Sequence, residues 1–162
     1  MTAGTGADQC CDDGQARDSA LESMPSFLLN HIVHQYHQIL QARLKSLGVS
    51  TLKMRIIMSL KLHGSLSVNE LCGFAIAEQP TMSRALDSLE AQGLIYRAQS
   101  EQDSRLRLAA LTEAGEQVFD RIQPEILQVN AQMTRGLSQA QQQALMDNLG
   151  EVLARLRDMP RP

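Results

Sequence analysis

The sequence predicts a mainly α-helical protein with one small β-hairpin, and three observations lead to this prediction. Aromatic residues make up 3% of the chain while Leu, Met and Ala are abundant, a balance that suits helix packing better than β-sheets. Apolar residues recur at helical spacing along most of the chain. In residues 94–111, however, two short runs of strand type flank a polar segment, which is typical of a hairpin.

The composition fits one globular domain. Hydrophobic residues make up 43% of the 162 residues, which is enough for a core without disulfide bonds or metals. No run approaches the roughly 18 consecutive apolar residues of a membrane span, and the N-terminus does not have the pattern of a secretion signal. The three cysteines do not form an extracellular disulfide framework. We therefore expect a cytoplasmic protein with no membrane partner.

The first 23 residues differ from the rest of the chain. They contain Gly, Asp, Ser and Thr but hardly any large apolar side chain. Burial cannot offset the entropy of ordering such a segment, so we expect a disordered tail over residues 1–23 and a single domain over residues 24–158. The first helix of this domain follows Pro25 and ends near Gly48, a residue type that often terminates helices.

Residues 50–112 predict a lobe of three helices and a hairpin. The first of these helices, over residues 51–64, is apolar around much of its circumference, which indicates a place in the middle of the core. A short helix then begins at Ser67 and Glu70, which have the spacing of a capping box. The third helix begins near Pro80, where a first helical residue is expected.

Two longer helices complete the domain. Thr112 caps a helix that runs towards Gly136, and Ser138 and Gln141 form a second capping box before the last helix. Apolar stripes on the terminal helices exceed what a small lobe can cover, so we expect a second copy of the chain to bury them. The residues expected at this interface are Leu29, Val33, Leu149, Val152 and Leu156.

Two short helices around a tight turn, followed by a hairpin, form a helix-turn-helix with a wing. An α-helix fits the major groove of DNA, and a projecting hairpin can place an arginine in the adjacent minor groove. At about 100 degrees per residue, the third helix of the lobe turns Arg84 outward, with Thr81, Ser83, Asp87 and Ser88 around it. Their hydroxyls can bind phosphate oxygens or base edges, and the arginine can bind guanine.

Three stretches of this region form a recognisable pattern. The residues from Thr81 to Ile95 are followed by Asp103-Ser104-Arg105 and then by Leu111-Thr112-Glu113-Ala114-Gly115. Together they resemble the signature of the MarR family of winged helix-turn-helix transcriptional regulators, in which a D-x-R pattern in the wing precedes L-T-x-x-G.

The resemblance covers about residues 25–158. It implies a winged helix-turn-helix lobe at residues 50–112 between dimerisation helices at residues 24–48 and 113–158. It also implies a sequence-specific DNA-binding regulator, acting as a homodimeric repressor on a pseudo-palindromic operator and released by a small aromatic or phenolic effector.

The implied DNA contacts lie on the third helix of the lobe and on the wing. Arg105 is expected to enter the minor groove, with Asp103 holding its guanidinium in position. The full set of expected DNA-binding residues is Thr81, Ser83, Arg84, Ser88, Arg97, Asp103, Arg105 and Arg107. Lys53 and Arg55 are further candidates for backbone contacts. Acidic residues beside these arginines predict a low nonspecific affinity.

Two sensing mechanisms remain as alternatives to an organic effector. His31, His34 and His37 indicate a metal-sensing regulator, but His37 lies well round the helix from His31, and we predict no metal site. Cys10 and Cys11 indicate a redox sensor, but they lie in the predicted tail without a basic neighbour to lower their pKa.

Two other classes of protein fit the sequence less well than a DNA-binding regulator does. No nucleophile with a base, carboxylate pair or phosphate loop occurs at recognisable spacing, so we expect neither an enzyme nor a cofactor. The formal net charge of −3 excludes a protein that coats nucleic acid nonspecifically. It leaves a winged-helix module for protein contacts as an alternative, although Arg84 and Arg105 at groove-facing positions favour DNA.

Overall fold

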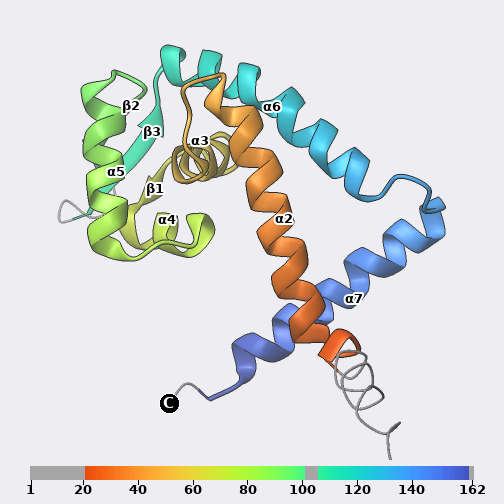
Figure 1. Cartoon of the computed structure of the whole chain (residues 1–162). Helices are drawn as coiled ribbons and strands as arrows, with labels where there is room; N and C mark the ends of the chain where they lie inside the picture. The colour runs from red at the N-terminus through yellow and green to blue at the C-terminus, as the bar shows by residue number, and fades with distance from the viewer. Residues whose placement is uncertain (1–20, 101–105, 161–162) are drawn as a thin grey trace, which may run out of the picture.

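The computed structural model describes residues 21–100 and 106–160, and it confirms a mainly helical fold with one small sheet. Figure 1 shows the elements, which follow the predicted order along the chain. They are α2 (Pro25–Lys45), α3 (Thr51–His63), β1 (Leu66–Ser67), α4 (Val68–Ala75), α5 (Gln79–Ala91), β2 (Ile95–Gln99), β3 (Arg107–Leu111), α6 (Glu113–Met133) and α7 (Gln139–Asp158).

The sheet within the described residues has three antiparallel strands in the order β1-β3-β2, whereas the sequence predicted two. β1 pairs Leu66 with Ala109 of β3. β2 and β3 form the predicted hairpin, which places Gln99 opposite Arg107. The prediction missed β1 because a strand of two residues is too short to show the alternation that identifies strands.

The hydrophobic core surrounds α3, the helix predicted to lie in its middle. Its buried residues point in several directions, so α3 contacts α4, α5, α6 and the sheet. Met54 of α3 and Met82 of α5 are 5% and 0% exposed, which shows that these methionines fill the core. The same cluster includes Leu40 and Leu44 near the end of α2.

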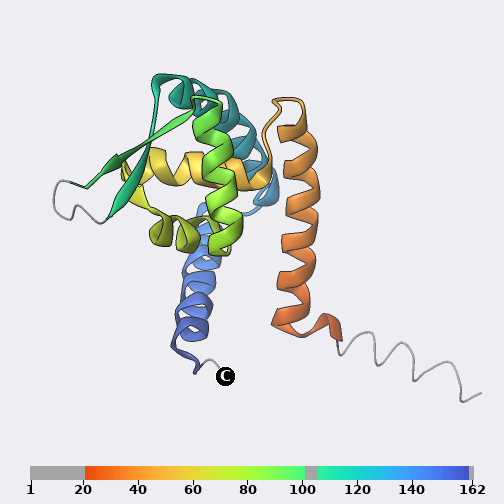
Figure 2. The ribbon, with the colours of Figure 1, turned by 90° about the vertical axis from the view of Figure 1, so that its left-hand side faces the viewer.

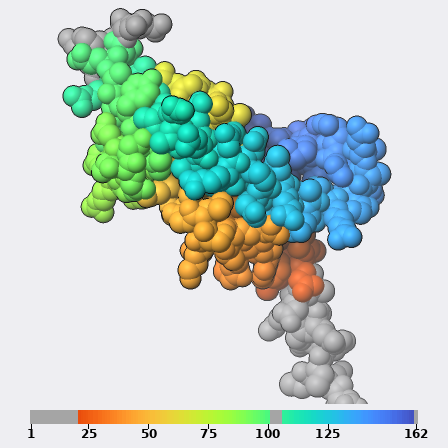
Figure 3. Space-filling view, turned by 90° about the horizontal axis from the view of Figure 1, so that it is seen from above, coloured from red at the N-terminus to blue at the C-terminus, as the bar shows by residue number. Residues whose placement is uncertain are grey.

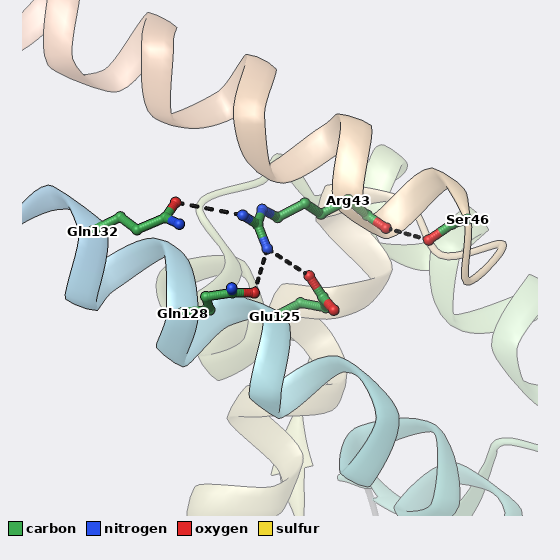
Figure 4. Close-up of polar contacts among 5 residues, drawn as sticks. All are labelled: Arg43, Ser46, Glu125, Gln128 and Gln132. Atoms are coloured by element: carbon green, nitrogen blue, oxygen red, sulfur yellow. Dashed lines mark hydrogen bonds and ion pairs between the residues drawn. The ribbon is translucent and has the colours of Figure 1, made fainter.

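A polar contact centred on Arg43 joins α2 to α6 (Figure 4). One guanidinium nitrogen of Arg43 donates to Glu125 Oε2 at 3.0 Å and to Gln128 Oε1 at 2.5 Å. The other donates to Gln132 Oε1 at 3.4 Å. These acceptors recur at helical spacing, so a single side chain of α2 binds two turns of α6.

α6 leads away from the helix-turn-helix lobe, and α7 runs back from the far end of α6 (Figure 1). Seen from above, α6 extends from the lobe towards the first part of α7 (Figure 3). α2 and α7 cross in the view of Figure 1 but run apart in that of Figure 2. α7 has no buried residue, so its side chains do not join the core.

The predicted tail is described only at its end. Leu21 and Glu22 are helical, while residues 1–20, including Cys10 and Cys11, lie outside the described residues. Among the helices that the structure describes, none is both long enough and apolar enough to cross a membrane.

Candidate nucleic-acid interface

The helix-turn-helix consists of α4, a short turn and α5, and local sequence signals set its boundaries. Ser67 accepts a hydrogen bond from the backbone of Glu70, whose carboxylate accepts one from the Ser67 backbone at 2.8 Å, so the predicted capping box starts α4. α4 ends at Ile76, which has a left-handed backbone with φ 54°. Pro80 lies at the second position of α5, one residue later than predicted, and its missing N–H costs no helical bond there.

One face of α5 is buried, and this fixes what its other face presents. Met82, Leu86 and Leu89 are each 0% exposed. On the opposite side Thr81 and Arg84 are exposed, as the helical spacing predicted. Within the described part of the chain, Arg84 has neither a hydrogen bond nor an ion pair, so its guanidinium is available to a ligand.

Two hydroxyls flank Arg84 on α5. Ser83 and Ser88 are both partly buried. The Ser88 hydroxyl accepts a hydrogen bond from Gln92 Nε2 at 2.9 Å. Because the Ser88 hydroxyl is bonded within the helix, Ser83 fits the predicted role of a DNA contact better than Ser88 does.

The wing lies on the same side of the molecule as α5. Figure 2 looks onto this side and shows α5 in front, with the hairpin β2–β3 projecting beside it. Arg107 is exposed at the start of β3. One more backbone hydrogen bond extends the hairpin beyond the last residue of β2 and the first residue of β3: Ser100 N donates to Leu106 O at 2.9 Å. Asp103 and Arg105 lie outside the described residues.

Arg97 of β2 is bound within the chain. Its guanidinium forms ion pairs with Asp87 and, at 3.0 Å, with Glu90, both on α5. Its side chain is 19% exposed, and its Nε atom is buried without a hydrogen-bond partner in the described structure. The sequence analysis predicted that Arg97 contacts DNA, and it did not predict the ion pairs with Asp87 and Glu90.

The L-T-x-x-G segment connects the end of α5 to the start of α6. Thr112 donates through its hydroxyl to Gly93 O at 2.6 Å and through its backbone to Leu94 O at 3.1 Å. It also accepts from Gly115 N at 3.1 Å, which caps α6. A Cβ atom on Gly115 would lie 2.1 Å from Leu94 O, so only glycine allows this close approach.

The candidates for backbone contacts on α3 also have partners within the chain. Lys53 Nζ donates to Gln92 Oε1 at 3.1 Å. Arg55 is 2.5 Å from His37 Nε2 and also donates to the carbonyl oxygen of Ala75. Arg55 therefore connects α2, α3 and α4.

The histidines of α2 have three different environments. His31 packs against Phe27, His34 lies 2.9 Å from Gln38 Nε2, and His37 faces Arg55. No group of three or more His, Cys, Asp or Glu side chains converges in the part of the chain that the structure describes. The described histidines thus give no support to the metal-sensing alternative.

The exposed face of α5 beside the β2–β3 hairpin has the arrangement of the winged helix-turn-helix class, in which α5 is the recognition helix. A family model described as MarR family matches residues 49–106. The chain is 35% identical to a MarR-family transcriptional regulator from Silicibacter pomeroyi, with 87% of this chain and 95% of that chain covered and a TM-score of 0.78. This chain belongs to the MarR family of transcriptional regulators, which are not enzymes.

Other similar proteins extend the comparison. The transcriptional repressor IacR of Pseudomonas putida is 27% identical over 124 residues, which are 76% of this chain and 74% of that protein. A mutant MarR of E. coli complexed with operator DNA shares the fold, with a TM-score of 0.69, 22% identity, and coverage of 82% of this chain and 96% of that chain.

Proposed function

We propose that this chain is a homodimeric repressor that reads a pseudo-palindromic operator through α5 and the wing and is released by a small aromatic or phenolic effector. The observation that carries DNA reading is the exposed Arg84 on α5, which has no ion pair or hydrogen bond among the described residues. Thr81 and Ser83 adjoin it, so hydroxyl and guanidinium donors face the same groove. IacR, a curated relative, is a repressor, which supports repression as the direction of control.

The wing supplies the second set of contacts in this proposal. Arg107 is exposed on β3. Asp103 and Arg105 enter the proposal from the sequence alone, with Arg105 in the minor groove and Asp103 orienting it. A dimer would present this arrangement twice, with half-sites about one helical turn of DNA apart.

Exposed apolar side chains on the terminal helices support dimerisation. On α7, Leu145, Leu149 and Val152 are 38–40% exposed. On α2, Ile32 and Val33 are about half exposed. Because the described residues do not cover these faces, a second copy would remove a large apolar surface from water.

The proposed effector site lies between the dimerisation helices and the DNA-binding lobe, where α2 meets α3. Arg55, His37 and the half-buried Tyr36 supply polar groups in this region. Burial raises the pKa of the Tyr36 hydroxyl, while the charge of Arg55 lowers it. The neutral phenol of Tyr36 can bind the polar substituent of an aromatic ligand, whereas Arg55 and His37 would have to exchange part of their mutual contact for one with the ligand.

Fluorescence anisotropy tests DNA reading on the DNA upstream of the gene and on a scrambled duplex, over a series of salt concentrations. We expect Arg84→Ala to weaken operator binding by about 1–3 kcal/mol and to reduce the preference over scrambled DNA. Arg105→Ala should also weaken binding. Arg135→Ala removes the same charge between α6 and α7, away from the recognition helix, and should bind like wild type. Equal affinities for the two duplexes, or an unaffected Arg84→Ala variant, would refute the proposal.

A further inference from the structure

Asp87 and Glu90 are two carboxylates on the helix proposed to enter the major groove. α5 carries one cationic side chain, Arg84, and these two acidic ones. Asp87 follows Arg84 by three residues, so the two side chains are neighbours on the surface of the helix. An unpaired Asp87 could bind Arg84, and both carboxylates would repel the phosphates of DNA.

Arg97 reaches both carboxylates from the wing. Side chains alternate between the two faces of β2, so Arg97 lies on the same face as Ile95, which is 2% exposed. Its partner across the hairpin is the small residue Ala109. The stem of Arg97 thus lies at the edge of the core, and its guanidinium reaches Asp87 and Glu90 on α5.

From this arrangement we infer that Arg97 is a positioning residue, which binds Asp87 and Glu90 so that Arg84 stays free and the recognition helix does not repel DNA. This inference rests on the proposed function, because it concerns how α5 approaches DNA. It differs from a phosphate contact by Arg97 itself. The low exposure of Arg97 and its two carboxylate partners favour the internal role.

A mutant cycle on full-length protein separates the two roles. Arg97→Met keeps an apolar stem without the charge, and Asp87→Asn with Glu90→Gln removes the carboxylates but leaves amide acceptors. If Arg97 neutralises the carboxylates, Arg97→Met should weaken operator binding about tenfold at low salt, and the loss should shrink as salt screens the repulsion. In the D87N/E90Q background, the same Arg97→Met change should alter affinity by less than about twofold.

Other outcomes of the cycle would overturn the inference. If Arg97→Met lowers operator affinity equally in both backgrounds, Arg97 contacts DNA directly. If the change does not lower operator affinity in the wild-type background, Arg97 does not contribute to DNA binding. Arg97→Lys retains the charge and should recover most of the affinity, whereas a purely steric role would leave it as weak as Arg97→Met. Thermal melts of every variant test folding. Loss of preference for the operator in the wild-type protein itself would instead refute the proposed function.

Discussion

Gly115 occupies a position that has no room for a side chain. A Cβ atom there would approach the carbonyl oxygen of Leu94 to 2.1 Å, and this oxygen belongs to backbone that cannot rotate away. We expect Gly115→Ala to lower the free energy of unfolding by about 2–4 kcal/mol, measured by urea denaturation. Gly73→Ala is the matched control, since a Cβ on Gly73 meets nothing within 4 Å. It should stabilise α4 by up to about 1 kcal/mol, and equal effects of the two changes would contradict the steric argument.

Sequence patterns predict single residues well where the cause is local. The exposure of Thr81 and Arg84 follows from helical spacing alone, and the structure confirms it. The ion pairs of Arg97 could not be predicted in this way, because they depend on which face of β2 lies against α5. The need for Gly115 is likewise a tertiary effect, although the L-T-x-x-G pattern was visible.

The capping boxes of α4 and α7 show how far local rules reach at the scale of an element. Both were predicted from the spacing of a serine and a residue three positions later, and both are present. Glu70 closes the first box and Gln141 the second, with the same contact to the backbone N–H of the serine at 2.8 Å. The first box therefore depends on a charge and the second does not.

Acid should weaken the α4 cap. Hydrogen bonds from the backbone and side chain of Ser67 hold the pKa of Glu70 below its usual value of 4.5 in the folded chain. The resulting stability is present above the unfolded pKa and is lost as pH falls through the folded pKa. We expect the unfolding free energy of wild type to fall relative to that of Glu70→Gln between about pH 6 and pH 3.

Urea denaturation over this pH range gives the comparison. Glu22→Gln changes an exposed glutamate outside the capping boxes and is the control. Wild type and the Glu22→Gln variant should keep a nearly constant difference in stability across the range. A Glu70→Gln variant with the same constant difference would argue against the charged cap.

Arg43 tests the junction between α2 and α6. It is 27% exposed and has an ion pair and two hydrogen bonds to residues of α6. We expect Arg43→Ala to destabilise the protein by about 1 kcal/mol, since the pair is partly screened by solvent. Arg155→Ala removes an ion pair within α7 in which the arginine is 79% exposed, and it should change stability by less than about 0.5 kcal/mol. If the denaturation curves of the two variants coincide, Arg43 does not stabilise the contact between α2 and α6.

At the scale of the whole molecule, the described residues leave apolar side chains of α7 and of the first part of α2 exposed. One core joins the lobe to the end of α2 and to α6, while α7 has exposed Leu149 and Val152 and no buried residue. The sequence predicted these apolar stripes from periodicity, but periodicity cannot say what covers them. A face of this kind is expected at an interface between identical subunits.

Leu149→Asp should convert a dimer to a monomer, because a carboxylate buried without a partner costs more than the apolar contact it replaces. Sedimentation equilibrium should give wild type twice the chain mass of 17.9 kDa, and the variant the chain mass itself. Leu62→Asp, at a side chain 71% exposed on α3, is the control and should remain dimeric. The monomer should also lose operator affinity by at least about 100-fold, since the second half-site would no longer be bound by the same particle. If wild type sediments as a monomer, or if the Leu149→Asp variant remains a dimer, the exposed apolar side chains of α7 do not form the dimer interface.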